Sequence, residues 1–124
     1  MYKLAVKKDF IAQHYLVGGD WGPENQKHSH HYWIEIQLGG KDLDAHGFVV
    51  DIVEVNAGLE KLISYYRDKT LNDLPEFKDL NPSIENLARI SYQALYQTIH
   101  GKGISDLSVK VWEDEIASVT FKEE

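Results

Sequence analysis

The sequence contains no cysteine, which excludes disulfides, thiolate zinc ligands and thiol nucleophiles together. Histidine, aspartate and glutamate are the strong metal ligands that remain. Basic residues are also scarce, since 13 lysines and arginines stand against 20 aspartates and glutamates, for a formal net charge of -7. The basic side chains are scattered along the chain, which argues against a surface that follows nucleic-acid phosphates. We therefore expect no nucleic-acid partner.

Long apolar runs are absent as well. No run approaches the roughly 20 residues that span a bilayer, and the first ten residues lack the continuous apolar stretch of a signal peptide. We therefore expect a cytoplasmic protein with no membrane partner. No linker rich in proline, glycine or serine divides the chain, and 43% of its 124 residues are apolar. Residues 1–124 are expected to form a single domain.

Alternating apolar residues predict strands in the first half of the chain. Residues 2–15 carry apolar side chains at even positions, with Lys8 as an exception, and residues 31–40 repeat the pattern. Residues 48–52 (FVVDI) are expected to form a third strand, the hairpin partner of residues 31–40.

The second half of the chain changes period. Apolar residues recur at three and four over residues 53–68, which predicts a helix. A second helix is predicted within residues 81–103, with Gly101 at its end. Alternation returns in residues 107–114 and 116–123, which predicts a final hairpin. Strands and helices in this order indicate an α+β fold.

Three histidines occur within four residues in the segment QKHSHHYWIEIQL (26–38). Residues two apart on a strand share a face, so His28 and His30 can place their imidazoles side by side while His31 points away. Zinc needs three protein ligands if a fourth position is to stay open for chemistry. His14, at the end of the first strand's inward face, is the candidate third ligand. The same run is equally typical of an exposed, metal-free turn, and spacing alone does not separate the two.

Six short motifs follow one another over residues 10–114. They are FIAQH (10–14), HSHHY (28–32), GFVVDI (47–52), LNDLP (71–75), NPSIEN (81–86) and VWED (111–114). In this order they resemble the 6-pyruvoyl-tetrahydropterin synthase family, which includes the 6-carboxytetrahydropterin synthases of queuosine biosynthesis. Any one motif is a weak signal, whereas six ordered matches are a strong one. The resemblance implies the tunnelling fold: an antiparallel four-stranded sheet with two helices on one face, which assembles into a barrel.

The resemblance also implies a ligand set. It assigns Zn²⁺ to His14, His28 and His30, and it assigns the amino-pyrimidine edge of a pterin to Glu113. A carboxylate can accept two parallel hydrogen bonds from that edge. Without the resemblance, Glu113 is an ordinary solvated strand residue. Glu85, within NPSIEN, either supports the ligand site or only stabilises the first turn of its helix.

The activity implied is a zinc-assisted rearrangement of 7,8-dihydroneopterin triphosphate, in which the usual members employ a cysteine base and an Asp-His dyad. This chain differs from the usual members at both the cysteine position and the Asp-His position. Glu24 stands near the cysteine position, which resembles a subgroup that releases 6-hydroxymethyldihydropterin for folate synthesis; otherwise Glu24 is a loop acid. The dyad aligns with Arg67-Asp68, or with Asp68-Lys69 after a slip of one residue. These three charges are also typical of a solvated helix end.

Three functional hypotheses remain after these comparisons of motifs. The first is a zinc-dependent lyase acting on dihydroneopterin triphosphate or a related pterin, with Glu24 and Asp68 as candidate catalytic residues. The second is a zinc- and pterin-binding paralogue with lost or altered catalysis. The third is a metal-binding assembly protein without a pterin ligand. Because open strand edges need cover, and because the tunnelling fold closes into a barrel, we expect a homohexamer built from trimers, with Glu113 facing the histidines across a subunit boundary.

Overall fold

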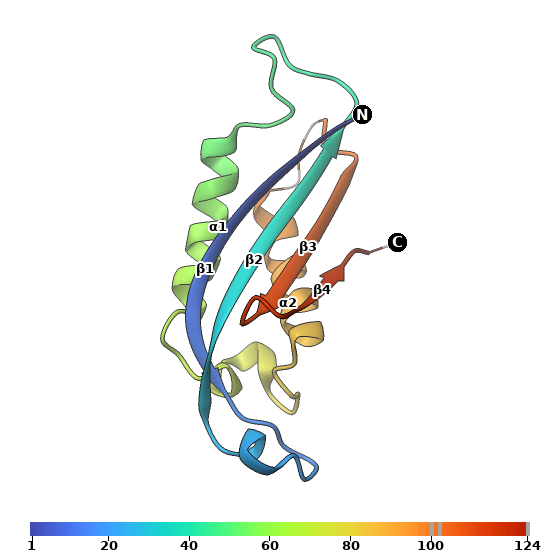
Figure 1. The fold of residues 1–124 in the computed structure, drawn as a ribbon. Coiled ribbons are helices and arrows are strands. Elements are labelled where there is room, and N and C mark those ends of the chain that lie inside the picture. Colours follow the sequence, from blue (N-terminus) through green and yellow to red (C-terminus); the bar gives the residue numbers. More distant parts are fainter. Residues whose placement is uncertain (100, 102, 124) are drawn as a thin grey trace.

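Four antiparallel strands form one sheet in the computed structural model, which describes residues 1–99, 101 and 103–123. They are β1 (Tyr2–His14), β2 (His28–Gly40), β3 (Asp106–Glu113) and β4 (Ala117–Phe121). Each strand pairs with the next along the chain, so the spatial order is β1-β2-β3-β4 (Figure 1). The sheet is long and twisted, and β1 and β2 form its longest hairpin.

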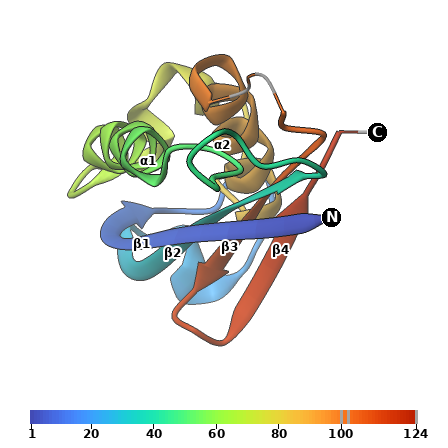
Figure 2. The ribbon, with the colours of Figure 1, turned by 90° about the horizontal axis from the view of Figure 1, so that it is seen from above.

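Two helices, α1 (Ile52–Tyr66) and α2 (Ile84–Ile99), cover one face of this sheet and leave the other face open (Figure 2). Short 3₁₀ turns lie in the connections, namely η1 (Gly22–Asn25), η2 (Leu71–Asp73) and η3 (Pro75–Phe77). The α+β class and the four-stranded antiparallel sheet with both helices on one face are therefore confirmed.

Alternation along the strands builds the core. The buried side chains of β1, β2 and β3 share the face that packs against the helices; they include Phe10, Ala12, Tyr32, Ile34, Ile36, Leu38, Leu107, Val109 and Val111. Lys8 also lies on the inward side of β1. Its ammonium nitrogen reaches Oε2 of Glu60 on α1, 3.4 Å away, so the aliphatic stem can cover apolar surface while the charge stays near solvent.

The expected third strand at residues 48–52 is wrong. Strand β2 already has β1 on one edge and β3 on the other, so no ladder position is left for a further hairpin partner. The chain instead runs from β2 through an irregular loop into α1. Asp51 ends that loop as the N-cap, because its Oδ1 accepts a hydrogen bond from the backbone N–H of Val53 at 2.9 Å.

Elsewhere, the observed ends of strands and helices differ by a few residues from the expected ones, as element ends commonly do. Strand β2 begins at His28 rather than at residue 31, which brings the histidine run onto the strand itself. Helix α2 begins at Ile84, and Ser83 caps it by accepting a hydrogen bond from the N–H of Asn86. Gly101 lies outside the helix, while residue 100, where the helix was expected to finish, is outside the described residues.

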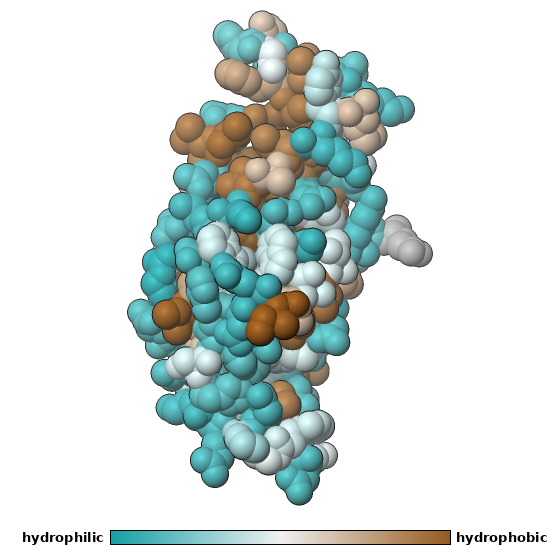
Figure 3. Space-filling model, viewed as in Figure 1, coloured by the Kyte–Doolittle hydropathy of each residue, from teal (hydrophilic) through white to brown (hydrophobic). Residues whose placement is uncertain are grey.

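Apolar surface gathers at the end of the molecule that carries the loop after β2 and the start of α1 (Figure 3). Large exposed apolar side chains in these segments are Leu43, Phe48, Ile52 and Val53. Strands β1 and β4 are the two edge strands of the sheet, and the last residues of β1 bond on their outer side to residues 68–70. No helix among the described residues combines the length and apolar character needed to cross a membrane.

Candidate metal centre

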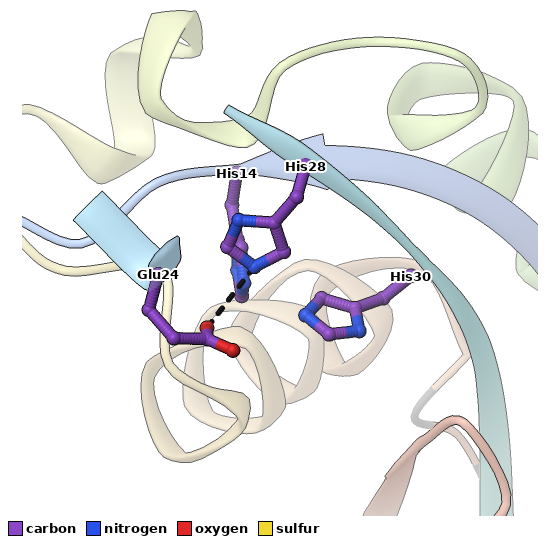
Figure 4. Close-up of side chains that lie close together, drawn as sticks. All are labelled: His14, Glu24, His28 and His30. Carbon is purple, nitrogen blue, oxygen red and sulfur yellow. Dashed lines mark ion pairs between the residues drawn. The ribbon is translucent and has the colours of Figure 1, made fainter. Parts of the chain in front are cut away.

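Three imidazole rings meet at the end of the sheet where β1 and β2 are joined by residues 15–27 (Figure 4). His14 ends β1 and is the direct cross-strand partner of His28, the first residue of β2. His30 lies two residues further along β2 and therefore on the same face. The ring centroids are 4.6 Å apart for His14–His28 and 4.7 Å for each of the other two pairs.

The two nitrogens of each ring have opposite surroundings. Every Nδ1 lies against an acceptor: Pro82 O at 3.0 Å for His14, Gln26 O at 2.7 Å for His28, and Asp114 Oδ2 at 2.5 Å for His30. Every Nε2 is buried, and the one acceptor within hydrogen-bond distance of any of them among the described residues is Oε2 of Glu24, 3.1 Å from Nε2 of His28. Donation from Nδ1 leaves the lone pair on Nε2, so the three rings present three unprotonated nitrogens to one point.

That arrangement fits a cation. A buried polar atom without a partner is costly, and here three buried ring nitrogens converge, two of them, on His14 and His30, with no hydrogen bond. His14 is 2% exposed, and burial lowers its pKa, with the backbone contact at Pro82 acting in the opposite direction. A neutral imidazole is the form that binds zinc, and three such nitrogens leave one tetrahedral position open.

Residues of the NPSIEN and LNDLP motifs hold the end of β1 and the loop that follows. Pro82 supplies the carbonyl against His14. Asn72 exchanges two hydrogen bonds with the backbone of Tyr15, at 3.0 and 2.9 Å, and Asn81 does the same with Val17, at 2.8 and 3.1 Å. Neither asparagine was assigned to the site from the sequence, although their presence in two of the six motifs was a usable signal.

Glu24 lies at the mouth of the histidine triangle. It sits in η1, and its Oε2 is 3.1 Å from Nε2 of His28 (Figure 4). The turn is held by Asn25, whose side-chain amide donates to the carbonyls of Leu16 and Gly19. The side chain of Glu24 is 49% exposed, so it borders the site from the solvent side. His14, Glu24, His28 and His30 together form a group whose ligand atoms all lie within 4.8 Å of one another.

Glu113 reaches the same site from β3. It is the last residue of that strand and the cross-strand partner of Tyr32, and its Oε1 is 3.8 Å from Nε2 of His30. Its side chain is 29% exposed, and burial raises the pKa of its carboxyl, partly opposed by His30. The expectation that Glu113 faces the histidines across a subunit boundary is therefore corrected, since both lie within one chain.

Other candidates from the sequence lie outside this group. The N–H of Asp68 donates to the carbonyl of Ile11 at 2.7 Å, and Asp68 has a positive φ of 61°, which marks the turn after α1. Glu85 is exposed in the first turn of α2. His31 points away from the triangle, and its Nε2 is 2.9 Å from Oδ2 of Asp9.

Sequence comparison relates nearly the whole chain to a known family. Residues 3–124 match the sequence profile described as 6-pyruvoyl tetrahydropterin synthase. The chain belongs to the 6-pyruvoyl tetrahydropterin synthase family. Membership covers both the histidine motifs and the β3–β4 hairpin, and it makes the chain a member of a family of lyases. No curated protein matches this sequence significantly.

Solved structures of the family share the fold at low sequence identity. The chain is similar to the Caenorhabditis elegans 6-pyruvoyl tetrahydropterin synthase, with a TM-score of 0.86 and 19% identity over 99% of this chain and 96% of that one. It is also similar to the Plasmodium falciparum enzyme, with a TM-score of 0.83 and 12% identity over 98% and 97%. A Plasmodium vivax 6-pyruvoyltetrahydropterin synthase, solved as an alanine variant of a glutamate named as a catalytic residue, gives 0.81 and 14% over 99% and 98%.

Proposed function

We propose that this protein is a zinc-dependent lyase that acts on 7,8-dihydroneopterin triphosphate or a related pterin. The observation that carries the proposal is the convergence of three buried Nε2 atoms, from His14, His28 and His30, beside the carboxylate of Glu24. The three histidines supply the nitrogen ligands. These residues would hold the metal. Zinc bound by three imidazoles supplies a Lewis acid that acidifies a hydroxyl at its open position.

Glu113 is proposed to bind and orient the pterin. Its carboxylate lies beside His30, so a ring system held there would direct its side chain toward the histidine triangle. The amino-pyrimidine edge of a pterin offers a ring N–H and an exocyclic amine, which two carboxylate oxygens can accept in parallel. Partial burial of Glu113 strengthens such a contact, because water competes less for the same oxygens.

Glu24 is proposed as the general base. It enters from a loop at the open side of the triangle, 3.1 Å from Nε2 of His28, and a substrate hydroxyl held there would lie within its reach. The carboxylate can take a proton from the substrate side chain and return it at a neighbouring atom. The P. vivax relative, in which a glutamate is named as a catalytic residue, supports a carboxylate in this role.

A second candidate function keeps the ligands and changes the reaction. The segment from α1 to η2 contains no histidine, and Asp68 is engaged with β1 instead of the histidine group. A zinc- and pterin-binding protein with altered catalysis is therefore the alternative. A metal protein without a pterin is less favoured, because it gives no reason for a partly buried carboxylate beside His30.

We also propose that the chain self-associates into trimers and hexamers. β1 and β4 are edge strands with one strand neighbour each; residues 68–70 bond to the last residues of β1, and the rest of its edge is open to another strand. Joining β4 of one copy to β1 of the next would extend the sheet and close it into a ring. The exposed apolar side chains near the start of α1 offer a further surface for contact between copies.

The deciding experiment incubates the purified, zinc-loaded protein with 7,8-dihydroneopterin triphosphate and separates the products by chromatography. The lyase proposal expects consumption of the substrate and loss of the triphosphate from the pterin, either free or on a cleaved two-carbon fragment, together with a pterin product whose side chain identifies the reaction. The alternative expects the pterin to bind and to be recovered unchanged. A protein stripped of metal by a chelator serves as the matched control.

A further inference from the structure

One of the three histidines differs from the others in what holds its Nδ1. Backbone carbonyls face the rings of His14 and His28, whereas His30 faces the side chain of Asp114 at 2.5 Å. The other carboxylate oxygen of Asp114 accepts the backbone N–H of His31 at 3.0 Å. The backbone N–H of Asp114 in turn donates to the carbonyl of His31 at 2.7 Å. Asp114 therefore connects the end of β3 to the middle of the histidine run.

The backbone at Asp114 is unusual in a way that bears on this contact. Asp114, Glu115 and Ile116 connect β3 to β4; Asp114 and Glu115 are the central residues of a turn closed by the N–H of Ile116, which donates to the carbonyl of Glu113 at 3.1 Å, and their φ values are 54° and 60°. A turn with two positive φ values normally contains Asn-Gly, Asp-Gly or Gly-Gly, because side chains other than those of Asn and Asp are disfavoured there. A strained turn persists only when surrounding contacts hold it. The bonds from Asp114 to β2 are such contacts.

The geometry points to Asp114 as a positioning residue for the metal ligand His30, and this inference rests on the zinc site proposed above. The carboxylate holds the proton on Nδ1 and fixes the plane of the ring, so Nε2 keeps its lone pair and points at His14 and His28. An imidazole whose Nδ1–H faces a carboxylate is a stronger electron-pair donor to a metal than one whose Nδ1–H faces a carbonyl. The β3–β4 turn is thereby part of the metal centre, although none of its atoms belongs to the histidine triangle.

The turn offers a matched pair of variants. Replacing Asp114 with glycine removes the carboxylate and leaves a residue that adopts positive φ freely. Glu115→Gly makes the same backbone change at the next position, where the side chain contacts Nε1 of Trp33 and no histidine. We expect zinc affinity, measured by competition with a chromophoric chelator, to fall about 10- to 100-fold in Asp114→Gly and to stay at the wild-type value in Glu115→Gly.

Unchanged zinc affinity in Asp114→Gly would overturn the inference, and so would an equal loss in both variants, since that would assign the effect to the turn backbone. Should Asp114→Gly fail to fold, Asp114→Asn takes its place: one of the two oxygen positions becomes an NH₂ donor and the negative charge facing Nδ1 of His30 is removed, so we again expect zinc affinity to fall.

A second readout separates this inference from the zinc proposal itself. Nitrogen-15 NMR of the metal-free protein reports which ring nitrogen of neutral His30 carries the proton. We expect Nδ1–H in the wild type and in Glu115→Gly, and a shift toward Nε2–H in Asp114→Gly. A wild type that binds no zinc would defeat the proposed function, yet the tautomer would still decide the role of Asp114. Finding Nε2–H in the wild type would overturn that role.

Discussion

His14 and His28 stand directly opposite each other in the β1–β2 ladder, with their ring centroids 4.6 Å apart. Strand register, and not the conformation of the connecting loop, therefore sets the first pair of the histidine triangle. The period of β2 then adds His30 on the same face. Because all three residues belong to strands, their side chains are held before any ion arrives, and little ordering is needed on binding.

Zinc binding should depend on the triangle and not on the neighbouring histidine. Replacing His28 with alanine leaves two nitrogens, too few for a stable site, and we expect zinc to be lost from the purified protein. His31→Ala is the matched control, because His31 lies on the other face beside Asp9. Elemental analysis should find one zinc per chain in the wild type and in the control. Zinc retained by His28→Ala, or lost from His31→Ala, would show that the ligands are different.

Glu24 should contribute to turnover without contributing to metal affinity. Glu24→Gln keeps the size of the side chain and removes the base, so we expect turnover of dihydroneopterin triphosphate to fall by about 10²-fold or more. Asp20→Asn, in the same loop, is the control: Oδ1 of Asp20 accepts the N–H of Gly22, and an amide oxygen can do the same. If zinc affinity fell together with turnover in Glu24→Gln, Glu24 would be a fourth ligand that closes the site.

Glu113 should control affinity for the pterin ring. Glutamine presents one acceptor and one donor where two donors must be met, so binding should weaken by about 1–3 kcal/mol. Calorimetric titration with a reduced pterin measures this, provided the zinc content is unchanged. Glu115→Gln, two residues along, is the control for a change of charge. Equal pterin affinity in the wild type and Glu113→Gln would return Glu113 to the status of a solvated strand residue.

The same substitution should stabilise the metal-free fold at neutral pH. Burial raises the pKa of Glu113 above its ordinary value, so the folded state favours the neutral form. The stability that Glu113 contributes is fully present below the pKa that its carboxyl has in the unfolded chain. This stability is lost as the pH rises through the higher pKa that the carboxyl has in the folded chain. The unfolding temperature of Glu113→Gln, relative to that of the wild type, should therefore rise as the pH increases from about 4 toward 7. A constant difference across this range would contradict the burial effect.

Assembly should be visible in the mass of the particle. The chain has a mass of 14.2 kDa, and a sheet whose two edge strands lack a second strand neighbour is expected to pair with further copies. Light scattering coupled to gel filtration should find the hexamer, with the trimer as the unit that persists on dilution. A stable monomer at micromolar concentration would contradict the proposed barrel.

Local patterns in the sequence were sufficient for much of this protein. Alternation identified β1, most of β2 and the final hairpin, and the change of period identified both helices, because each pattern depends on side chains a few residues apart. Spacing placed His28 and His30 on one face with His31 opposite. The ordered motifs pointed to the family to which the chain belongs.

Tertiary structure decided which strands pair and which side chains from distant segments meet at the site. Residues 48–52 were expected to form a strand, yet β3 takes the edge of β2 that they would need. Strand register brings His14 opposite His28 and places Glu113 beside His30 within one chain. The acceptors at each Nδ1 come from the chain segments around Gln26, Pro82 and Asp114. No periodicity in the sequence relates these segments to the histidines, because the contacts form only when the strands of the sheet have paired.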